Sequence, residues 1–146
     1  MFRFERLKVW PKALAFADQA ITLSIRWPSE LQSSLGDQVR RAAVSVITNI
    51  AEGCGKRTGK SSRYYYDIAK GSVYEVIGVM ALARKRGLVS DADFRALYAS
   101  GDEVSAMLWG LMQASVAEVP AEYDLRGESS RGESDRGESS EERVAI

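Results

Sequence analysis

Apolar residues recur at steps of three and four along four long segments of this chain, and this spacing constrains the fold more than any other feature. In the stretch QVRRAAVSVITNIAEG, the apolar positions are Val39, Ala42, Ala43, Val46 and Ile50. Such steps place side chains on one face of an α-helix, whereas a half-buried strand would alternate apolar and polar residues. No segment gives a convincing pair of strands. The sequence therefore predicts an all-α fold.

Helix-starting and helix-ending residues set the expected boundaries. We expect four helices, at residues 9–26, 34–52, 62–86 and, after a cap at Ser90, 91–117. Ser34 and Asp37 have the spacing of a capping box at the start of the second helix, and Gly53 and Gly55 are expected to end it. Four such helices joined by short loops predict an antiparallel, up-down-up-down four-helix bundle.

The apolar pattern also predicts the buried faces and hints at assembly. In the first helix we expect one buried face, formed by Trp10, Leu14, Ala17, Ile21 and Ile25. Val44 and Ile47 lie outside the main apolar row of the second helix, and Trp109 stands beside Leu108 in the fourth. A single bundle has little room for helices that are apolar on two sides, so these residues predict self-association.

The chain divides by charge and complexity. Residues 1–117 hold 16 Lys and Arg against 11 Asp and Glu, whereas residues 118–146 hold 4 against 9. The final segment contains the repeat RGESS RGESD RGESS, which has nothing to bury and is expected to be disordered. We therefore expect a basic bundle domain at residues 1–119 and an acidic, low-complexity tail at residues 120–146.

The polar inventory argues against an enzyme. The chain has no histidine and one cysteine, which removes the commonest general base and the commonest zinc ligand. Cys54 has no second thiol or imidazole to share a metal with. A paired-carboxylate hydrolase would need Glu52 and Glu75 to face each other, and we regard this as the weaker alternative. We expect no catalytic residues, no metal and no cofactor.

The stretch IAEGCGKRTGKSSRYYY resembles a phosphate-binding loop because it contains Gly59, Lys60 and Ser61. Such a loop needs another glycine five positions before Gly59, where this chain has Cys54, and it follows a buried strand rather than a helix. The pattern instead predicts a glycine-rich, basic connector between two helices.

Two groups of cations are candidates for binding nucleic acid. The connector carries four positive charges, on Lys56, Arg57, Lys60 and Arg63, followed directly by Tyr64, Tyr65 and Tyr66. Cations pair with phosphates and tyrosine rings stack on bases, so the connector predicts a polyanion site, with a solvated loop as the alternative. Arg40 and Arg41 lie about 25 Å away at 1.5 Å per helical residue, so only an oligomer could join the groups.

Three further polar residues interrupt apolar helices. Asn49 and Glu52 lie in the second helix and Glu75 in the third. Because buried polar groups need partners, we expect these three to form a structural network between helices or between subunits.

Neither a membrane span nor a secretory signal is expected. No apolar run approaches about 18 residues, and the start MFRFERLKVW lacks an uninterrupted apolar region. With the single cysteine, these features predict a cytoplasmic protein without membrane contact.

Three stretches, FERLKVW, QVRRAAVSVITNIAEG and YYYDIAKGSVYEV, carry a family resemblance over about residues 2–116. In order and spacing the chain resembles the four-helix-bundle proteins encoded in intervening sequences of bacterial 23S ribosomal RNA genes. The resemblance implies a homopentamer without enzymatic activity. It also implies likeness in fold to the accessory variability protein of diversity-generating retroelements, which binds nucleic acid and a reverse transcriptase through a basic surface.

By this analogy, nucleic acid would contact six residues, namely Arg40, Arg41, Lys56, Arg57, Lys60 and Arg63. The expectation is a non-enzymatic homo-oligomer that binds RNA or other nucleic acid. The alternative is a protein-interaction scaffold, such as an accessory subunit of a reverse transcriptase.

Overall fold

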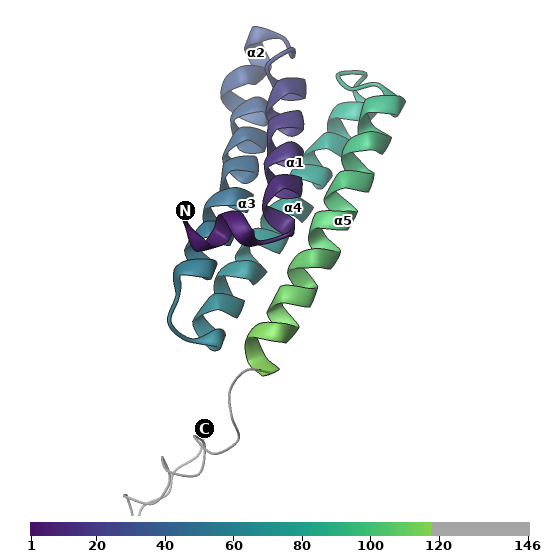
Figure 1. Ribbon diagram of the computed structural model, residues 1–146. Helices are drawn as coiled ribbons and strands as arrows, with labels where there is room; N and C mark the ends of the chain where they lie inside the picture. The colour runs from purple at the N-terminus through teal and green to yellow at the C-terminus, as the bar shows by residue number, and fades with distance from the viewer. Residues whose placement is uncertain (118–146) are drawn as a thin grey trace, which may run out of the picture.

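The computed structural model describes residues 1–117, which form an antiparallel bundle of four long helices (Figure 1). The long helices are α1 (Val9–Ser24), α3 (Asp37–Gly55), α4 (Gly59–Lys85) and α5 (Asp91–Ala117). The shorter elements are a 3₁₀ turn η1 (Arg3–Arg6), α2 (Ser29–Leu31) and a π-helical turn η2 (Gln32–Gly36). No strand occurs in this part of the chain, so the predicted all-α bundle is confirmed. The predicted tail at 120–146, and the domain end at 119, lie outside the described residues.

The core lies between the four long helices, which pack in the order α1, α3, α4, α5, with α5 closing against α1. Every long helix contributes large, fully buried side chains, among them Phe16, Ile50, Met80, Leu97 and Leu108. Each such burial contributes roughly 1.5–3 kcal/mol. The predicted apolar row of α3, from Val39 to Ile50, is entirely buried and is therefore confirmed.

The predicted buried face of the first helix is wrong in its larger members. Leu14 and Ile25 are exposed, and Trp10 and Ile21 pack only at the edge of the core. The buried residues of α1 include a row of small side chains, made of Ala13, Ala17 and Ala20, around Phe16. Small side chains let neighbouring helices approach α1 closely, which a ranking by hydrophobic size does not reveal.

The predicted capping box at the start of the second helix is also wrong. Ser34 lies inside the π-helical turn, where its hydroxyl donates to the Leu31 carbonyl at 3.3 Å. Because η2 runs straight into α3, Asp37 follows residues that are already helical and the helix needs no cap there. At the other end α3 continues to Gly55 instead of residue 52.

Two glycines allow neighbouring helices to pack closely and do not end a helix. Gly53 is buried within α3, where an added Cβ would lie 2.8 Å from the ring of Tyr66. Gly59 is the first residue of α4, and an added Cβ there would overlap the carbonyl oxygen of Ser115 near the end of α5. The Gly-Lys-Ser triplet therefore contains its glycine for helix packing.

Serine and threonine caps begin the last two helices. The Thr58 hydroxyl accepts the backbone N–H of Ser61 at 3.2 Å, so α4 starts at Gly59, three residues earlier than predicted. The Ser90 hydroxyl accepts the N–H of Asp93 at 3.1 Å, which confirms the predicted cap of the fourth helix.

Candidate nucleic-acid interface

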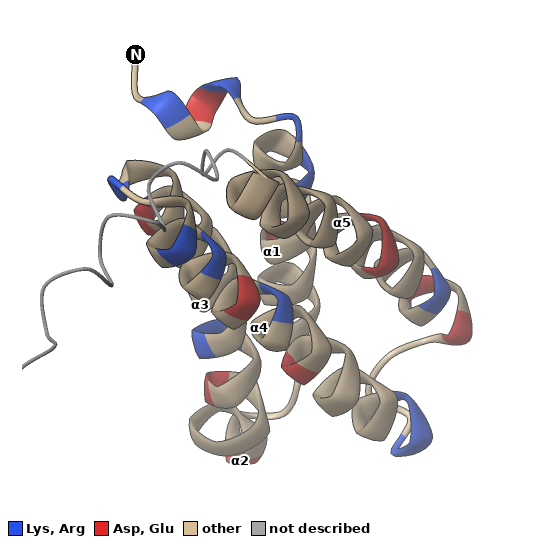
Figure 2. Cartoon of the chain, turned by 90° about the horizontal axis from the view of Figure 1, so that it is seen from below, with Lys and Arg blue, Asp and Glu red and all other residues tan. Residues whose placement is uncertain are grey.

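The basic connector is shorter than predicted, because only Lys56, Arg57 and Thr58 lie between α3 and α4. Lys60 and Arg63 belong to the first turns of α4. The predicted cations thus gather where two antiparallel helices meet, at one end of the bundle. Figure 2, in which the bundle is seen from below, shows Lys and Arg on the connector, the start of α4 and η1. We call Lys56, Arg57, Lys60, Arg63 and Tyr64 the connector surface.

Three of the four cations on this surface lack a carboxylate partner among the described residues. The Lys56 ammonium lies 3.1 Å from Glu52 Oε1 and 4.4 Å from the centre of the Tyr65 ring. The hydrogen bond to Glu52 raises the pKa of Lys56 above its usual value. Within residues 1–117, no carboxylate lies within 4.0 Å of the charged groups of Arg57, Lys60 or Arg63. No carboxylate of the described bundle therefore neutralises these three charges.

The N-terminus of α4 also favours the binding of an anion. The first turn of a helix carries N–H groups without an intrahelical acceptor and a partial positive charge. Acidic residues are common there because they stabilise it, yet the first turn of α4 contains none and carries Lys60 instead. Helix N-termini with added cations attract phosphates and other anions.

The N-terminal segment adds two cations that the sequence patterns did not indicate. Arg3 and Arg6 lie in η1, which packs against α3 (Figure 1). Burial raises the pKa of Tyr66 to about 12, and the positive charge of Arg3 opposes part of this rise. A four-residue turn has no apolar periodicity, and its position on α3 follows only from the folded chain.

The three consecutive tyrosines have different environments. Tyr64 is 63% exposed and its ring meets the ring of Tyr65 edge-on at 5.2 Å. Tyr65 is half-buried beneath Lys56. Tyr66 is buried beside Cys54, and burial raises its pKa to about 12. Of the three, Tyr64 therefore offers the most open ring for stacking.

A fourth aromatic ring joins this end from α5. Trp109 is 49% exposed and borders a groove that is also lined by Lys60, Arg63, Tyr64 and the acidic residue Asp67. The sequence marked Trp109 as apolar surface, but its place beside the connector depends on how α5 packs against α4.

Arg40 is occupied within its own chain. Its Nη1 donates to Gln32 Oε1 at 2.8 Å and its Nη2 donates to the Gln32 carbonyl at 2.7 Å. Gln32 in turn donates to the Trp27 carbonyl at 2.7 Å. Arg40 therefore holds the π-helical turn against the end of α1, in a structural role that the sequence did not indicate.

Arg41, the neighbour of Arg40, is exposed on the surface of α3. Its Nε lies 2.8 Å from Asp37 Oδ2. Arg40 and Arg41 lie near the start of α3, whereas the connector follows its end. The two basic groups therefore form separate surfaces on one chain.

The polar residues Asn49, Glu52 and Glu75 do not form one network within the chain. Asn49 Nδ2 donates to Ser45, whose hydroxyl lies 2.8 Å from that of Ser72 and so links α3 to α4. Glu52 is exposed and pairs with Lys56, whereas Glu75 is exposed and accepts a 3.3 Å hydrogen bond from Gln38.

The two glutamates also do not form a carboxylate pair. Gln38, the partner of Glu75, lies about 20 Å from Glu52 along α3 at 1.5 Å per residue. Within residues 1–117, no group of three or more His, Cys, Asp or Glu could hold a metal ion.

The family model for the 23S rRNA-intervening sequence protein matches residues 5–110. This range covers most of the bundle and more than half of the chain. The chain belongs to this family. The match confirms the resemblance carried by the three sequence stretches. No curated protein matches the chain closely enough to add a relative. Among the described helices of this family member, none is long and apolar enough to cross a bilayer.

Proposed function

We propose that this member of the 23S rRNA-intervening sequence protein family is a non-enzymatic, cytoplasmic protein that binds RNA through its connector surface. The observation that carries the proposal is that Arg57, Lys60 and Arg63, at the positive end of α4, form no ion pair with any carboxylate of residues 1–117. Tyr64 and Trp109 add exposed rings beside these charges. Cations with adjacent aromatic rings match a polymer of phosphates and bases.

Salt dependence measures how many cations contact phosphate. Each contact releases condensed counterions, so the logarithm of the binding constant falls with the logarithm of salt concentration by about 0.7–0.9 per contact. Four cations on the connector surface correspond to a slope contribution of roughly 3.

The experiment compares two variants that lose the same charge from opposite ends of the bundle. One replaces Lys56, Arg57, Lys60 and Arg63 by alanine. The matched control replaces four cations at the far end by alanine, namely Arg26, Lys85, Arg86 and Arg95, which form no ion pair among residues 1–117. Binding of a labelled, structured RNA is measured across a salt series.

We expect the slope to fall by about 2–3 in the connector variant and to stay near the wild-type value in the control. Equal slopes in the two variants would place the phosphate contacts elsewhere. An unmodified protein that fails to bind RNA near physiological salt would refute the proposed function.

We further propose that the protein acts as a homo-oligomer, with the family resemblance favouring a pentamer. Large apolar side chains remain exposed on single chains, including Val44 on α3, Ile68 on α4 and Leu82 on α4. Such residues favour a contact surface. Sedimentation equilibrium would yield the mass of a pentamer, and a purely monomeric protein would contradict this part of the proposal.

The same exposed apolar residues support a second candidate function, a scaffold that recruits a protein such as a reverse transcriptase. This candidate takes precedence if the assembly forms but the connector surface does not bind RNA. Val44→Glu and Ile68→Glu would then abolish protein recruitment without splitting the assembly, whereas the connector variant would retain recruitment.

A further inference from the structure

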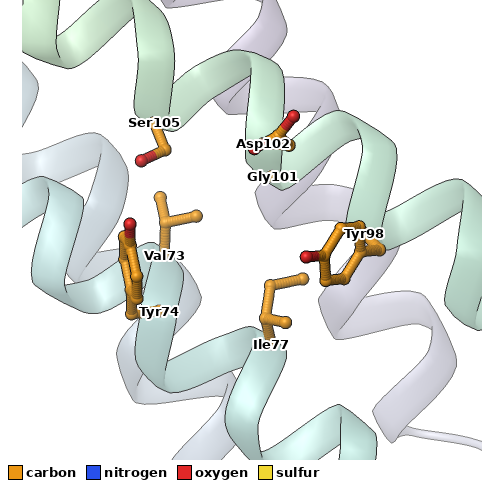
Figure 3. Close-up of a pocket in the computed structure, with 7 residues that line it drawn as sticks. All are labelled: Val73, Tyr74, Ile77, Tyr98, Gly101, Asp102 and Ser105. Carbon is orange, nitrogen blue, oxygen red and sulfur yellow. The ribbon is translucent and has the colours of Figure 1, made fainter.

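A pocket opens between α4 and α5, beyond the connector surface (Figure 3). Its volume is about 200 Å³. Helix α4 contributes Val73, Tyr74 and Ile77, and α5 contributes Tyr98, Gly101, Asp102 and Ser105. None of these residues took part in the predictions made from the sequence about binding.

The pocket has aromatic walls and an apolar floor. Tyr74 is 64% exposed and Tyr98 is 54% exposed, and Figure 3 shows their rings on opposite sides with Ile77 between them. Gly101 is buried, and a Cβ there would lie 2.9 Å from the Phe16 ring and 3.2 Å from Ile77. Because Gly101 has no side chain, Ile77 and Phe16 can pack against α5 beneath the pocket. The space suits a flat, aromatic group.

Asp102 supplies a hydrogen-bond acceptor at the rim. Its side chain comes from α5 and is exposed beside Tyr98 (Figure 3). Among residues 1–117, no Lys or Arg lies within 4.0 Å of its carboxylate. A carboxylate accepts hydrogen bonds and does not donate them, so it favours an occupant that bears an amino group.

A stripe on α4 connects the pocket to the connector surface. Lys60, Arg63, Asp67, Lys70 and Tyr74 follow one another at steps of three, four, three and four residues and so share one helix face, on which one carboxylate stands among three cations. The Lys70 ammonium lies 5.3 Å from the centre of the Tyr74 ring and 5.5 Å from that of Trp109. Arg63 and Tyr74 are about 16 Å apart along α4 at 1.5 Å per residue, a distance that a few nucleotides of extended strand can span.

We propose that the α4–α5 pocket binds one unstacked base of a single-stranded RNA segment whose backbone continues over Lys70 onto the connector surface. This inference rests on the proposed RNA binding and adds the strandedness and the base class. Stacking on the tyrosines holds the base, and Asp102 accepts the exocyclic amino group of cytosine, adenine or guanine. Uracil lacks that group and is disfavoured.

The test uses the full chain and short labelled strands of oligocytidylate, oligoadenylate and oligouridylate, with a duplex RNA of equal length. The variant Tyr74→Ala with Tyr98→Ala removes both walls. The matched variant Tyr74→Phe with Tyr98→Phe keeps the rings, and Leu14→Ala removes an exposed apolar residue of α1 outside the pocket. Thermal unfolding shows whether each variant remains folded.

We expect the alanine pair to weaken oligocytidylate binding by about 10- to 100-fold, the effect of losing one base stack. The salt slope should stay unchanged because no cation is lost. The phenylalanine pair and Leu14→Ala should bind oligocytidylate with an affinity close to that of the wild type. The alanine pair should bind duplex RNA with an affinity close to that of the wild type. Asp102→Asn should reduce the preference for oligocytidylate over oligouridylate, a ratio that a general change in charge does not alter.

Each remaining outcome separates this inference from the proposed function. If the connector variant loses RNA but the alanine pair binds oligocytidylate as wild type does, the pocket inference is wrong and the proposed function stands. If the alanine pair loses oligocytidylate while the connector variant keeps its slope, the pocket stands and the connector site is wrong. If the alanine pair instead splits an assembly without changing affinity, the pocket is an interface between copies and the inference is overturned.

Discussion

At the far end of the bundle, the guanidinium of Arg40 donates to both oxygens of Gln32, whereas at the connector end no carboxylate of residues 1–117 pairs with Arg57 or Lys60. Both ends are basic in the sequence. The difference is the supply of acceptors, because the π-helical turn brings carbonyl and amide oxygens to Arg40, whereas the described part of the chain brings no carboxylate within 4.0 Å of Arg57 or Lys60. A cluster of cations therefore indicates binding only where the fold leaves the charges unused.

The largest effect is expected from removing the structural arginine. Arg40→Met leaves the carbonyl and side-chain oxygens of Gln32 without their charged donor, so we expect a loss of about 2–4 kcal/mol in the free energy of unfolding. The control Arg41→Met removes an exposed ion pair and should cost less than about 1 kcal/mol. Urea unfolding at one fixed protein concentration measures both. Equal losses would show that Arg40 holds no structure.

The next largest loss in the free energy of unfolding is expected from disturbing the contact between α4 and α5. Gly59→Ala places a methyl group on the Ser115 carbonyl and should destabilise the bundle by about 1–3 kcal/mol. The control Gly71→Ala, in the middle of α4 with open space around it, should stabilise the helix by up to about 1 kcal/mol. Opposite signs in thermal unfolding are the expected result, and a stabilising Gly59→Ala would contradict the packing.

A smaller effect concerns the buried phenol beneath the connector. Burial raises the pKa of Tyr66 to about 12 from an ordinary value of 10.0. Above pH 10 the unfolded chain releases this proton first, so stability is fully present below pH 10 and falls between pH 10 and 12. The fall is at most about 1.4 kcal/mol per pH unit for one proton.

Tyr66→Phe should remove that part of the pH dependence, whereas Tyr64→Phe at an exposed position should leave it in place. Unfolding free energies measured across this pH window decide the matter. Identical pH profiles for wild type and Tyr66→Phe would mean that the phenol is not protected by burial.

The smallest effect is expected from removing the ion pair at the connector end. Glu52→Gln removes the partner of Lys56 and frees its charge, so we expect RNA affinity to rise by about 2- to 5-fold at low salt, with little change in stability. The control Glu75→Gln removes an equal charge that contacts Gln38 instead. A matching rise in both variants would indicate a general charge effect and no specific role for Lys56.

The four-helix architecture could be predicted because apolar periodicity reports which residues face a core. The row from Val39 to Ile50 is buried as expected, and Ser90 caps α5 as expected. Thr58 could also have been identified, since threonine is one of the residues favoured at a helix N-cap. The predicted buried face of the first helix was wrong because small alanines form much of the true buried face. A pattern based on hydrophobicity gives alanine less weight than Leu14 or Ile25.

The candidate site was less predictable because it depends on contacts between distant segments. The role of Arg40 requires the path of a π-helical turn, which sequence spacing does not encode. The approach of Trp109 to Lys70, and of η1 to α3, depends on how the helices settle against one another. The sequence thus located the cations of the connector and the three tyrosines that follow them, but it did not show that Trp109 and η1 lie at the same end of the bundle.

Lysine footprinting tests the central contrast most directly. The protein is acetylated with and without structured RNA, and mass spectrometry measures modification at Lys56 and Lys60 on the connector surface and at Lys85 at the far end. We expect RNA to protect Lys56 and Lys60 while Lys85 reacts as it does in the free protein. Protection of Lys85 with unchanged reactivity at Lys56 and Lys60 would contradict the account.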